Sequence, residues 1–490
     1  MTGAASLPYG FARTHGVILR HAVPPACAVR AGFDPKALMP VLAEVRRVTG
    51  AGFAIEVLAD AAFNALLAQT YRASASDASD AAGADGDLAR LADDAAVVDD
   101  LLDQSQDAPV VRLINALLAE AIKEGASDIH IETQEKRLVV RFRIDGVMRE
   151  MVEPKRALAP LLVSRIKVMA RLDIAEKRLP QDGRVSLRVG GHEVDVRVST
   201  IPSHYGERVV MRLLDRDATR LGLPRLGMAP RDAEVFERLL ARPGGMVLVT
   251  GPTGSGKTTT LYAALDHLND QSRNIMTVED PIEYALDGIG QMQVNPRTDL
   301  SFARGLRAIL RQDPDVIMVG EIRDRETAEV AVEAAMTGHL VLSTLHTNSA
   351  IGAVARLIDM GVERFLLAPM LAGVVAQRLV RRLCPACCAE DVAGLSDAAL
   401  LPGIELGEPV WRTVGCPACQ GQGYRGRTGL YEVIEVAAPL EAAIHRGASE
   451  AELVALARAA GPGLVADGLR AVRAGVTTIT EVMRVAETGG

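Results

Sequence analysis

An α/β fold is predicted for the second half of the chain, on three observations. Residues 251–258 match the pattern G-x-x-x-x-G-K-[ST] between an apolar run at 246–250 and a segment that can open a helix. The apolar run 275–278 has strand length and ends in carboxylates. A further largely apolar run, 315–320, ends in Glu321. Open α/β sheets place polar side chains and ligands at the carboxyl ends of their strands, as these runs predict.

The glycine-rich loop predicts a polyphosphate site, because backbone N–H groups at a strand-to-helix turn can surround phosphate oxygens. Lys257 would reach the β- and γ-phosphates, and the Thr258 hydroxyl would help hold Mg²⁺. A chance match to the pattern is the alternative, and the strand–turn–helix context argues against it. The expected nucleotide-binding residues are Gly251, Pro252, Thr253, Gly254, Ser255, Gly256, Lys257, Thr258 and Thr259.

The acids after the second and third runs predict hydrolytic chemistry. Glu321 can hold Mg²⁺ through water or polarise the attacking water, and Glu279 and Asp280 would lie at the same sheet edge. Surface acids at strand ends are the alternative. His339 and His346 flank a short apolar strand, and each is open to two interpretations, a γ-phosphate contact or a core or cap histidine.

Bulk properties limit the class of protein. The 490 residues suggest three or four domains, and the net charge of −8 argues against nucleic acid as the main partner. Residues 365–380 are the most apolar stretch, but Pro369, Gln377 and Arg378 interrupt it, so a bilayer span is not expected. With no secretory signal pattern at the N-terminus, we expect a cytoplasmic protein.

The first half predicts two smaller folded parts. Residues 1–72 contain helical stretches at 40–47 and 61–68 and are expected to form a small, mostly helical module. An acidic segment at 73–108 predicts a solvated linker. Apolar residues from Val110 to Ala121 recur at helical spacing, and alternating segments, the first ending in Asp145-Gly146, predict strands and a hairpin. This part is expected to be an α+β domain.

Four ordered motifs resemble those of the secretion-superfamily ATPases. Residues 251–258, 279–283, 320–324 and 344–348 are similar to the Walker A, Asp box, Walker B and His box of these hexameric motors of type II secretion and type IV pili. The resemblance covers about residues 109–490 and implies a RecA-like motor domain behind a PAS-like α+β domain. It implies ATP as the substrate.

The resemblance also implies residue roles. Glu321 would be the catalytic Walker B acid and His346 a γ-phosphate contact, with Glu279 and Asp280 positioning or activating water. Whether Glu279 or Glu321 activates the water stays open. The family inserts arginines from the preceding domain into an ATP site, and the matching positions are Arg197 and Arg212. Their alternative is the solvent face of a strand.

Two C-x₂-C pairs, separated by 28 residues, predict a Zn²⁺ site. Each turn can present two thiolates to one tetrahedral ion, and four thiolates leave no open position for catalysis. The loop is longer than the usual 15–20 residues, and reduced thiols or redox pairs are the alternative. The expected ligands are Cys384, Cys387, Cys416 and Cys419, with the adjacent Cys388 a competitor.

The segments 7–19 and 426–435 are similar to those of the type II secretion branch, the general secretory pathway E proteins (GspE). That branch implies a homohexamer on the cytoplasmic face of the inner membrane. It would dock through residues 1–72 on the inner-membrane protein GspL, and the platform protein GspF is a second implied partner. The basic run 378–382 could contact anionic lipid or pair with acidic groups, and we favour pairing.

The implied function is that of an ATPase motor that energises pseudopilus assembly and export of folded proteins; a type IV pilus assembly motor is the alternative. A nucleic-acid motor or a non-catalytic scaffold fits less well, given the acidic balance and the intact acids. The expected parts are a docking module at 1–72, a linker at 73–108, the arginine-bearing α+β domain at 109–220, a connector at 221–230, the ATPase domain at 231–383, the tetracysteine module at 384–425 and a C-terminal helical region at 426–490.

Overall fold

The computed structural model describes residues 17–20, 26–30, 41–42, 45–46, 54–59, 62–63, 107–189, 192–215 and 222–486. Two compact units, Met1–Glu120 and Ala121–Gly490, divide the chain. The predicted linker lies outside the described residues, except for its last two positions, which begin helix α5. The finer division of the chain into seven parts stays a prediction.

The first unit contains a three-stranded sheet. Its strands are β1 (Val17–Arg20), β2 (Ala26–Arg30) and β3 (Ala54–Leu58), with β1 antiparallel and β3 parallel to β2. The prediction of a mostly helical module did not include this sheet, because its strands are too short for their alternation to stand out in the sequence. The two predicted helices are described only at positions 41–42, 45–46 and 62–63, where the backbone is helical.

Helix α5 (Asp107–Lys123) spans the division between the units and buries the apolar side chains from Val110 to Ala121 that predicted it. The second unit then begins with a six-stranded antiparallel sheet, in the order β6-β5-β4-β9-β8-β7. The predicted hairpin is present: Asp145 and Gly146 both have positive φ, 50° and 84°, as a tight turn between twisted strands requires. The elements are β4 (Ala126–Thr133), β5 (Leu138–Ile144), β6 (Val147–Val152), η2 (Arg156–Leu158), α6 (Ala159–Met169), β7 (Gln181–Val189), β8 (His192–Ser203) and β9 (Gly206–Asp215).

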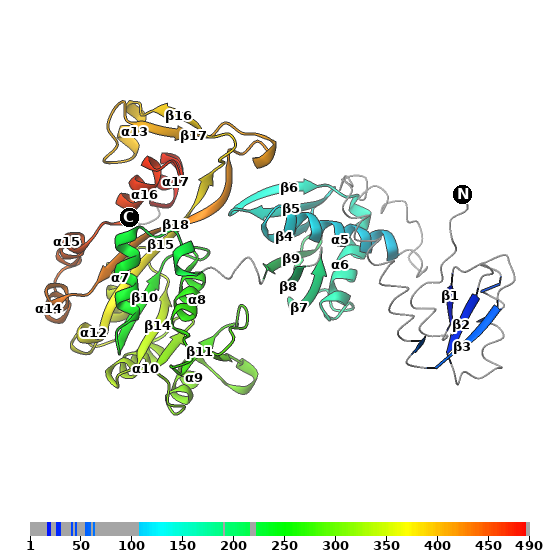
Figure 1. The fold of residues 1–490 in the computed structure, drawn as a ribbon, viewed down its shortest axis with the longest axis horizontal. Helices are drawn as coiled ribbons and strands as arrows, with labels where there is room; N and C mark the ends of the chain where they lie inside the picture. Colours follow the sequence, from blue (N-terminus) through cyan, green and yellow to red (C-terminus); the bar gives the residue numbers. More distant parts are fainter. Residues whose placement is uncertain are drawn as a thin grey trace. The chain divides into compact units, whose positions relative to one another are not determined.

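A seven-stranded sheet forms the centre of the second half, in the order β12-β11-β13-β14-β10-β15-β18 (Figure 1). All neighbours are parallel except β18, which returns antiparallel to β15. The carboxyl ends of β10, β11, β13 and β14 therefore meet at one edge. The strands are β10 (Gly245–Thr250), β11 (Ile275–Glu279), β12 (Gly290–Gln293), β13 (Val316–Val319), β14 (Leu340–Leu345), β15 (Leu371–Leu383) and β18 (Tyr424–Glu435).

Helices cover both faces of this sheet, and strand β10 shows why. Its side chains alternate between two apolar cores: Met246 and Leu248 belong to one, and Val247 and Val249 to the other. A strand buried on both faces has the continuous apolar sequence seen at 246–249. Helices η3 (Leu223–Arg225), α7 (Pro230–Leu240) and α8 (Lys257–Leu268) contribute to the second core; α9 (Phe302–Ile309), α10 (Arg325–Met336), α11 (Ala350–Asp359) and α12 (Arg364–Met370) contribute to the first.

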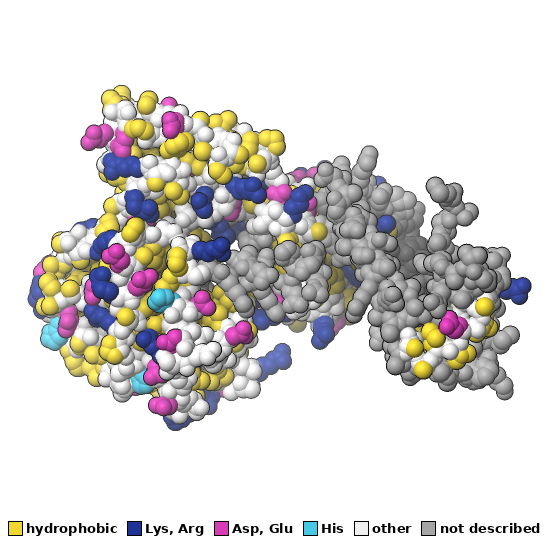
Figure 2. Space-filling view, in the orientation of Figure 1, with side chains coloured by type: hydrophobic (Ala, Val, Ile, Leu, Met, Phe, Trp, Pro, Cys, Tyr) yellow, Lys and Arg dark blue, Asp and Glu magenta, His cyan; other side chains and the backbone are white. Residues whose placement is uncertain are grey.

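The last part of the chain combines a cysteine-bearing lobe with helices. Residues 426–435 lie within the region predicted to be helical but belong to strand β18, whose buried Leu430, Val433 and Ile434 complete the sheet. Figure 2 shows hydrophobic side chains over the part of this lobe formed by β16 and α13, where Val392, Leu395 and others are exposed. The remaining elements are β16 (Ala389–Val392), α13 (Leu395–Leu400), β17 (Pro409–Arg412), η5 (Pro417–Cys419), α14 (Ala438–Arg446), α15 (Glu450–Ala460), α16 (Leu464–Arg473) and α17 (Ile479–Ala486).

Among the helices that the structure describes, none has the length and apolar content needed to cross a bilayer. The apolar stretch at 365–380 is divided between α12 and β15, both packed in the core of the second half. Within the basic run, Arg378 is buried and Arg381 pairs with Glu481 at 2.7 Å, so these two guanidinium groups face protein partners.

Candidate active site

The glycine-rich loop joins the end of β10 to α8 and depends on glycine at defined positions. Gly251, Gly254 and Gly256 have φ of 152°, 81° and 89°, which residues with a Cβ rarely adopt. A Cβ at Gly251 would also lie 2.5 Å from the backbone oxygen of Gln377 on β15. The loop can therefore curl tightly over the start of α8, where helix N–H groups are unpaired.

Lys257, the first residue of α8, lies inside this loop. Its ammonium donates to the carbonyl oxygens of Gly251 at 2.7 Å and Pro252 at 3.1 Å. Burial lowers the pKa of Lys257 to about 8, against the opposing effect of the nearby Glu321 carboxylate. A buried cation with mainly carbonyl partners is a strong site for an anionic group.

Glu279 ends β11 and is almost completely buried. Its carboxylate accepts hydrogen bonds from the Thr277 hydroxyl at 2.5 Å, from the Gln291 amide at 3.1 Å and from the Tyr262 hydroxyl. Burial nevertheless raises the pKa of Glu279, because desolvation outweighs these three bonds. A carboxyl group with a raised pKa at a cavity is suited to accepting a proton.

Glu321 follows β13 and lies between two basic side chains. One of its oxygens pairs with Arg323 and the other lies 3.4 Å from Nε2 of His346, which follows β14. Desolvation, together with the charge of Lys257, lowers the pKa of His346, so the imidazole is neutral at pH 7. Asp280 is more exposed and lies 3.8 Å from Arg323.

The two predicted histidines occupy different kinds of position. Nδ1 of His339 lies 2.8 Å from the carbonyl oxygen of Ala334, at the end of α10, which is the cap arrangement. His346 lies at the carboxyl edge of the sheet beside Glu321. Of the two interpretations left open by the sequence, the cap fits His339 and a site at the strand ends fits His346.

The predicted arginines lie directly opposite each other on β8 and β9, but only Arg212 reaches the cavity at the loop. Its Nε donates to Asp128 at 2.8 Å, and its side chain is 59 % exposed. Arg197 instead pairs with Glu283 at 2.6 Å and donates to the carbonyl oxygen of Ile282 at 3.2 Å. Arg197 thus contacts the segment after β11, whereas Arg212 pairs with Asp128 on its own sheet and borders the cavity.

A cavity of about 420 Å³ gathers most of the predicted site. Its wall combines the loop, the acids of β11 and β13, the histidine after β14 and Arg212 from the other sheet. Gly251, Pro252 and Arg197 do not line it. The predicted residues that do are Thr253, Gly254, Ser255, Gly256, Lys257, Thr258, Thr259, Glu279, Asp280, Glu321, His346 and Arg212.

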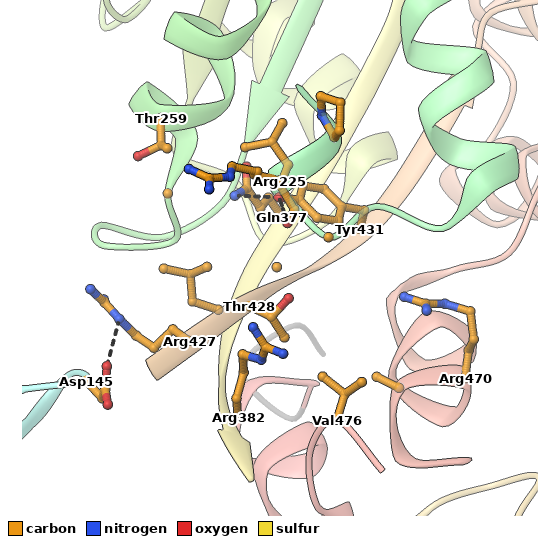
Figure 3. Close-up of a pocket in the computed structure, with 17 residues that line it drawn as sticks. Asp145, Arg225, Thr259, Gln377, Arg382, Arg427, Thr428, Tyr431, Arg470 and Val476 are labelled. Atoms are coloured by element: carbon orange, nitrogen blue, oxygen red, sulfur yellow. Dashed lines mark hydrogen bonds and ion pairs between the residues drawn. The ribbon is translucent and has the colours of Figure 1, made fainter. Parts of the chain in front are cut away.

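A second cavity, of about 510 Å³, shares Gly256, Thr259, Leu379 and Arg427 with the first. Figure 3 shows its side chains, with Arg427 paired to Asp145 at 3.6 Å and the buried Tyr431 at its wall. Its guanidinium groups make it attractive to anions. They come from Arg225, Arg382, Arg427 and Arg470.

Several side chains of the site were not predicted from the sequence. Tyr262, Gln291 and Arg323 contact the predicted acids, and Arg427 lines both cavities. Helical spacing contained one signal, because Tyr262 lies four residues after Thr258 and so on the same face of α8. Arg323 lies two residues after Glu321, within the motif at 320–324, whereas Gln291 and Arg427 depend on strand pairing that the sequence does not reveal.

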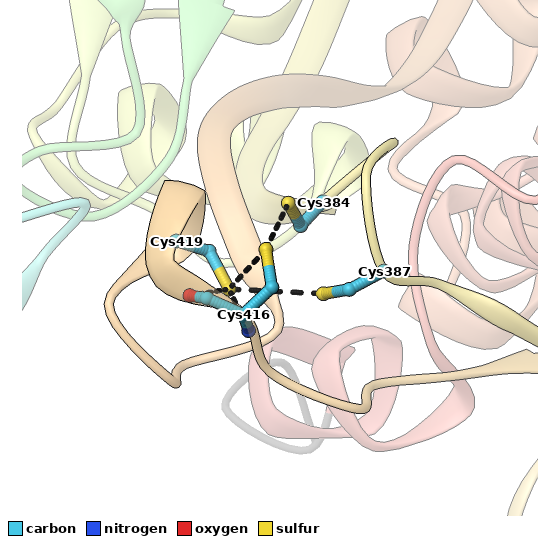
Figure 4. Close-up of side chains that lie close together, drawn as sticks. All are labelled: Cys384, Cys387, Cys416 and Cys419. Carbon is cyan, nitrogen blue, oxygen red and sulfur yellow. Dashed lines mark hydrogen bonds between the residues drawn. The ribbon is translucent and has the colours of Figure 1, made fainter.

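The four predicted cysteines come together at the ends of β15 and β18. Their Sγ atoms all lie within 4.8 Å of one another, and three pairs are 3.9, 3.7 and 3.8 Å apart (Figure 4). A tetrahedral Zn²⁺ with Zn–S bonds of about 2.3 Å places its sulfurs about 3.8 Å apart, so this donor set fits the ion. Cys388 is not a member of the cluster.

Parallel strands, a glycine-rich loop before a helix and carboxylates at the neighbouring strand ends together define a P-loop nucleotide hydrolase. A family model described as "Type II/IV secretion system protein" matches residues 103–484. The chain belongs to this family and is an ATPase of its type II secretion branch. A second model, which describes a domain of "GSPII protein E", matches residues 6–71.

Relatives of high sequence identity carry the name of this branch, and a solved structure shares the fold. The chain is 58 % identical over 487 residues to type II secretion system protein E of Pseudomonas aeruginosa, covering 98 % of this chain and 96 % of that protein. It is 57 % identical over 453 residues to type II secretion system ATPase E of Vibrio cholerae, covering 91 % and 90 %. The crystal structure of the pilus retraction motor PilT with bound ADP has a TM-score of 0.52 at 27 % identity, covering 76 % of this chain and 96 % of PilT.

Proposed function

We propose that this chain is the hexameric, Mg²⁺-dependent motor that hydrolyses ATP to energise pseudopilus assembly and export of folded proteins across the outer membrane. The convergence of Lys257, Glu279, Glu321, His346 and Arg212 on one cavity carries the proposal. A phosphate-binding cation, two carboxylates and an arginine from a second sheet are the parts that phosphoryl transfer requires.

The loop supplies binding and neutralisation of charge. Lys257 is buried and would exchange its two carbonyl partners for β- and γ-phosphate oxygens. The Thr258 hydroxyl and Glu321 line the same cavity and would hold Mg²⁺, directly or through water. The adjoining cavity shares loop residues with the first, so we place the nucleoside there.

The acids divide the remaining work. Glu321 lies beside a neutral His346, which can donate a hydrogen bond to the γ-phosphate or to its leaving oxygen. Glu279 has a raised pKa and no cationic partner among its hydrogen-bond donors, so we assign it the task of orienting water and accepting its proton. Asp280 would support this orientation from its exposed position.

The arginines link hydrolysis to movement. Arg212 would leave Asp128 to neutralise charge on the transferred phosphoryl group, and Arg197 would act through Glu283 or through a closed arrangement of the two sheets. ATP can drive such closure only if it binds the closed state more tightly than the open one. In a hexamer, closure and reopening would turn or lift the membrane proteins that build the pseudopilus.

The tetracysteine cluster would hold a structural Zn²⁺ through Cys384, Cys387, Cys416 and Cys419, and four thiolates exclude a catalytic water. Residues 6–71 match a domain of GSPII protein E, so we assign them to docking on GspL. GspF is the second proposed partner, and the cytoplasmic face of the inner membrane is the proposed location. The names of the similar proteins favour secretion over the type IV pilus alternative.

Lys257→Ala and Glu321→Gln test the proposal separately. We expect Lys257→Ala to lose ATP binding, and Glu321→Gln to keep binding while phosphate release falls about a thousandfold. Phosphate release by the assembled protein and secretion in cells that depend on the variant are the measurements. Wild-type hydrolysis and secretion in both variants would refute the assignment. Stimulation of hydrolysis by DNA would favour a nucleic-acid motor instead.

A further inference from the structure

The Tyr262 hydroxyl has a central place beside the proposed water-activating acid. Tyr262 is 1 % exposed and donates its hydroxyl proton to Oε2 of Glu279. The Tyr262 hydroxyl oxygen in turn accepts from the backbone N–H of Glu283 at 3.3 Å and from Nε2 of Gln291 at 3.5 Å. Its ring packs edge-to-face against Tyr284, with centroids 4.7 Å apart. A buried ring with this packing cannot easily reorient, so the hydroxyl is fixed.

From this geometry we infer that Tyr262 is a positioning residue for hydrolysis: its hydroxyl fixes the Glu279 carboxylate at the cavity and ties it to the 280–284 segment. The inference rests on the proposed role of Glu279. It adds to that role a second element of the fold: the orientation of the Glu279 carboxylate is set by Tyr262 on α8 as well as by β11. Tyr262 itself takes no proton from water.

In its hydrogen bond with Glu279, the Tyr262 hydroxyl is always the donor. Burial, reinforced by the adjacent Glu279, strongly raises the pKa of Tyr262, so the phenol stays protonated throughout the working pH range. Two further donors, Thr277 and Gln291, hold the other oxygen of Glu279. Glu283, after β11, is the charged group whose field acts on this carboxylate, and the cavity is also lined by the acids Asp280 and Glu321 and the cations Lys257, Arg212 and Arg427. The hydrogen bonds described for Glu279 all come from neutral donors, so these donors determine its orientation.

The network also reaches the arginine-bearing sheet. The Glu283 backbone donates to Tyr262, and the Glu283 side chain pairs with Arg197 on β8. Movement of that sheet would pull on the 280–284 segment and so on the hydroxyl that holds Glu279. This gives Arg197 a route to hydrolysis without entering the cavity.

Tyr262→Phe is the direct test, measured as kcat, KM and the pH profile of kcat on the assembled full-length protein. We expect kcat to fall about tenfold to a hundredfold with KM little changed, the usual effect of losing one hydrogen bond to a charged group. The acidic limb of the profile should move to higher pH, because removing a donor raises the pKa of Glu279 further. Tyr424→Phe, which loses a bond to Thr478 outside both cavities, is the matched control and should keep the wild-type profile.

Glu279→Gln separates the inference from the function on which it rests. If Glu279→Gln abolishes hydrolysis and folded Tyr262→Phe keeps the wild-type kcat and profile, the inference is wrong and the proposed function stands. If Glu279→Gln hydrolyses ATP normally, the role of Glu279 is wrong and the inference fails with it.

Should Tyr262→Phe not fold, 3,5-difluorotyrosine at position 262 provides a second measurement. It keeps the ring and donates more strongly, so it should move the acidic limb of the profile to lower pH. An unmoved limb in this protein would overturn the inference.

Discussion

The two ligand sites of this chain are built in opposite ways. The nucleotide cavity draws its side chains from four strand ends and a second sheet. Within the protein, Lys257 donates to a backbone carbonyl oxygen, and Glu321 and Arg212 form ion pairs with other side chains. The cysteine cluster draws four sulfur atoms from two short turns, and each lies close to the others. The difference teaches that an open site leaves charge available for a changing ligand, whereas a closed site satisfies one ion permanently.

Arg212→Ala should have the largest effect on the open site. Removing the guanidinium should lower kcat about a thousandfold, because an arginine that neutralises the transferred phosphoryl group contributes that much in known cases. Arg197→Ala should lower it less, since Arg197 does not line the cavity. Steady-state hydrolysis with saturating ATP and Mg²⁺ checks both. Equal, small losses would show that the second sheet does not complete the site.

Cys416→Ser should abolish metal binding at the cysteine cluster while ATP hydrolysis at the nucleotide cavity is kept. We expect bound zinc to fall from about one ion per chain to nearly none, with a lower unfolding temperature, because a structural ion stabilises the fold that holds it. Cys388→Ser is the matched control and should keep its zinc. Metal analysis and calorimetry are the measurements. A full complement of zinc in Cys416→Ser would contradict the tetracysteine assignment.

The smallest expected effect is on the pH dependence of ATP binding. The pKa of Lys257 is lowered to about 8 by burial, and bound phosphates would raise it. The protonated lysine binds phosphate, so affinity should be constant below pH 8 and weaken severalfold as the pH rises above it. Calorimetric titrations near pH 8 in buffers of different ionisation enthalpy should detect proton uptake. Binding that is independent of pH between about 7 and 9.5 would refute this.

Most of what the sequence predicted lies within continuous motifs. The loop at 251–258, the acids after β11 and β13, and both cysteine pairs are local patterns whose backbone geometry follows from a few residues. The sequence did not predict strand β18 as part of the sheet, because its place there depends on pairing with β15, some fifty residues earlier. Residue spacing contains no record of such a partner.

Side-chain partners were the other limit. That Arg197 would pair with Glu283, and that Tyr262 would hold Glu279, follows from how two sheets and a helix face one another. The family resemblance placed both arginines at the nucleotide, and only Arg212 lines the cavity. Long-range packing decided between two positions that the sequence treats alike.

The β15–β18 ribbon extends beyond the sheet and ends at the cysteines. β10 pairs with β15 only as far as Ala376, so residues 377–383 have β18 as their one strand partner, and α16, α17 and the turn between them pack against them. At about 3.4 Å per residue this two-stranded extension is about 24 Å long. Because of this length, a tilt of about 5° at the sheet would carry its tip through about 2 Å. A metal ion bound by the four cysteines at that tip would keep the two strands from sliding past each other. A small tilt of the sheet on nucleotide binding would then become a larger displacement at the cysteines.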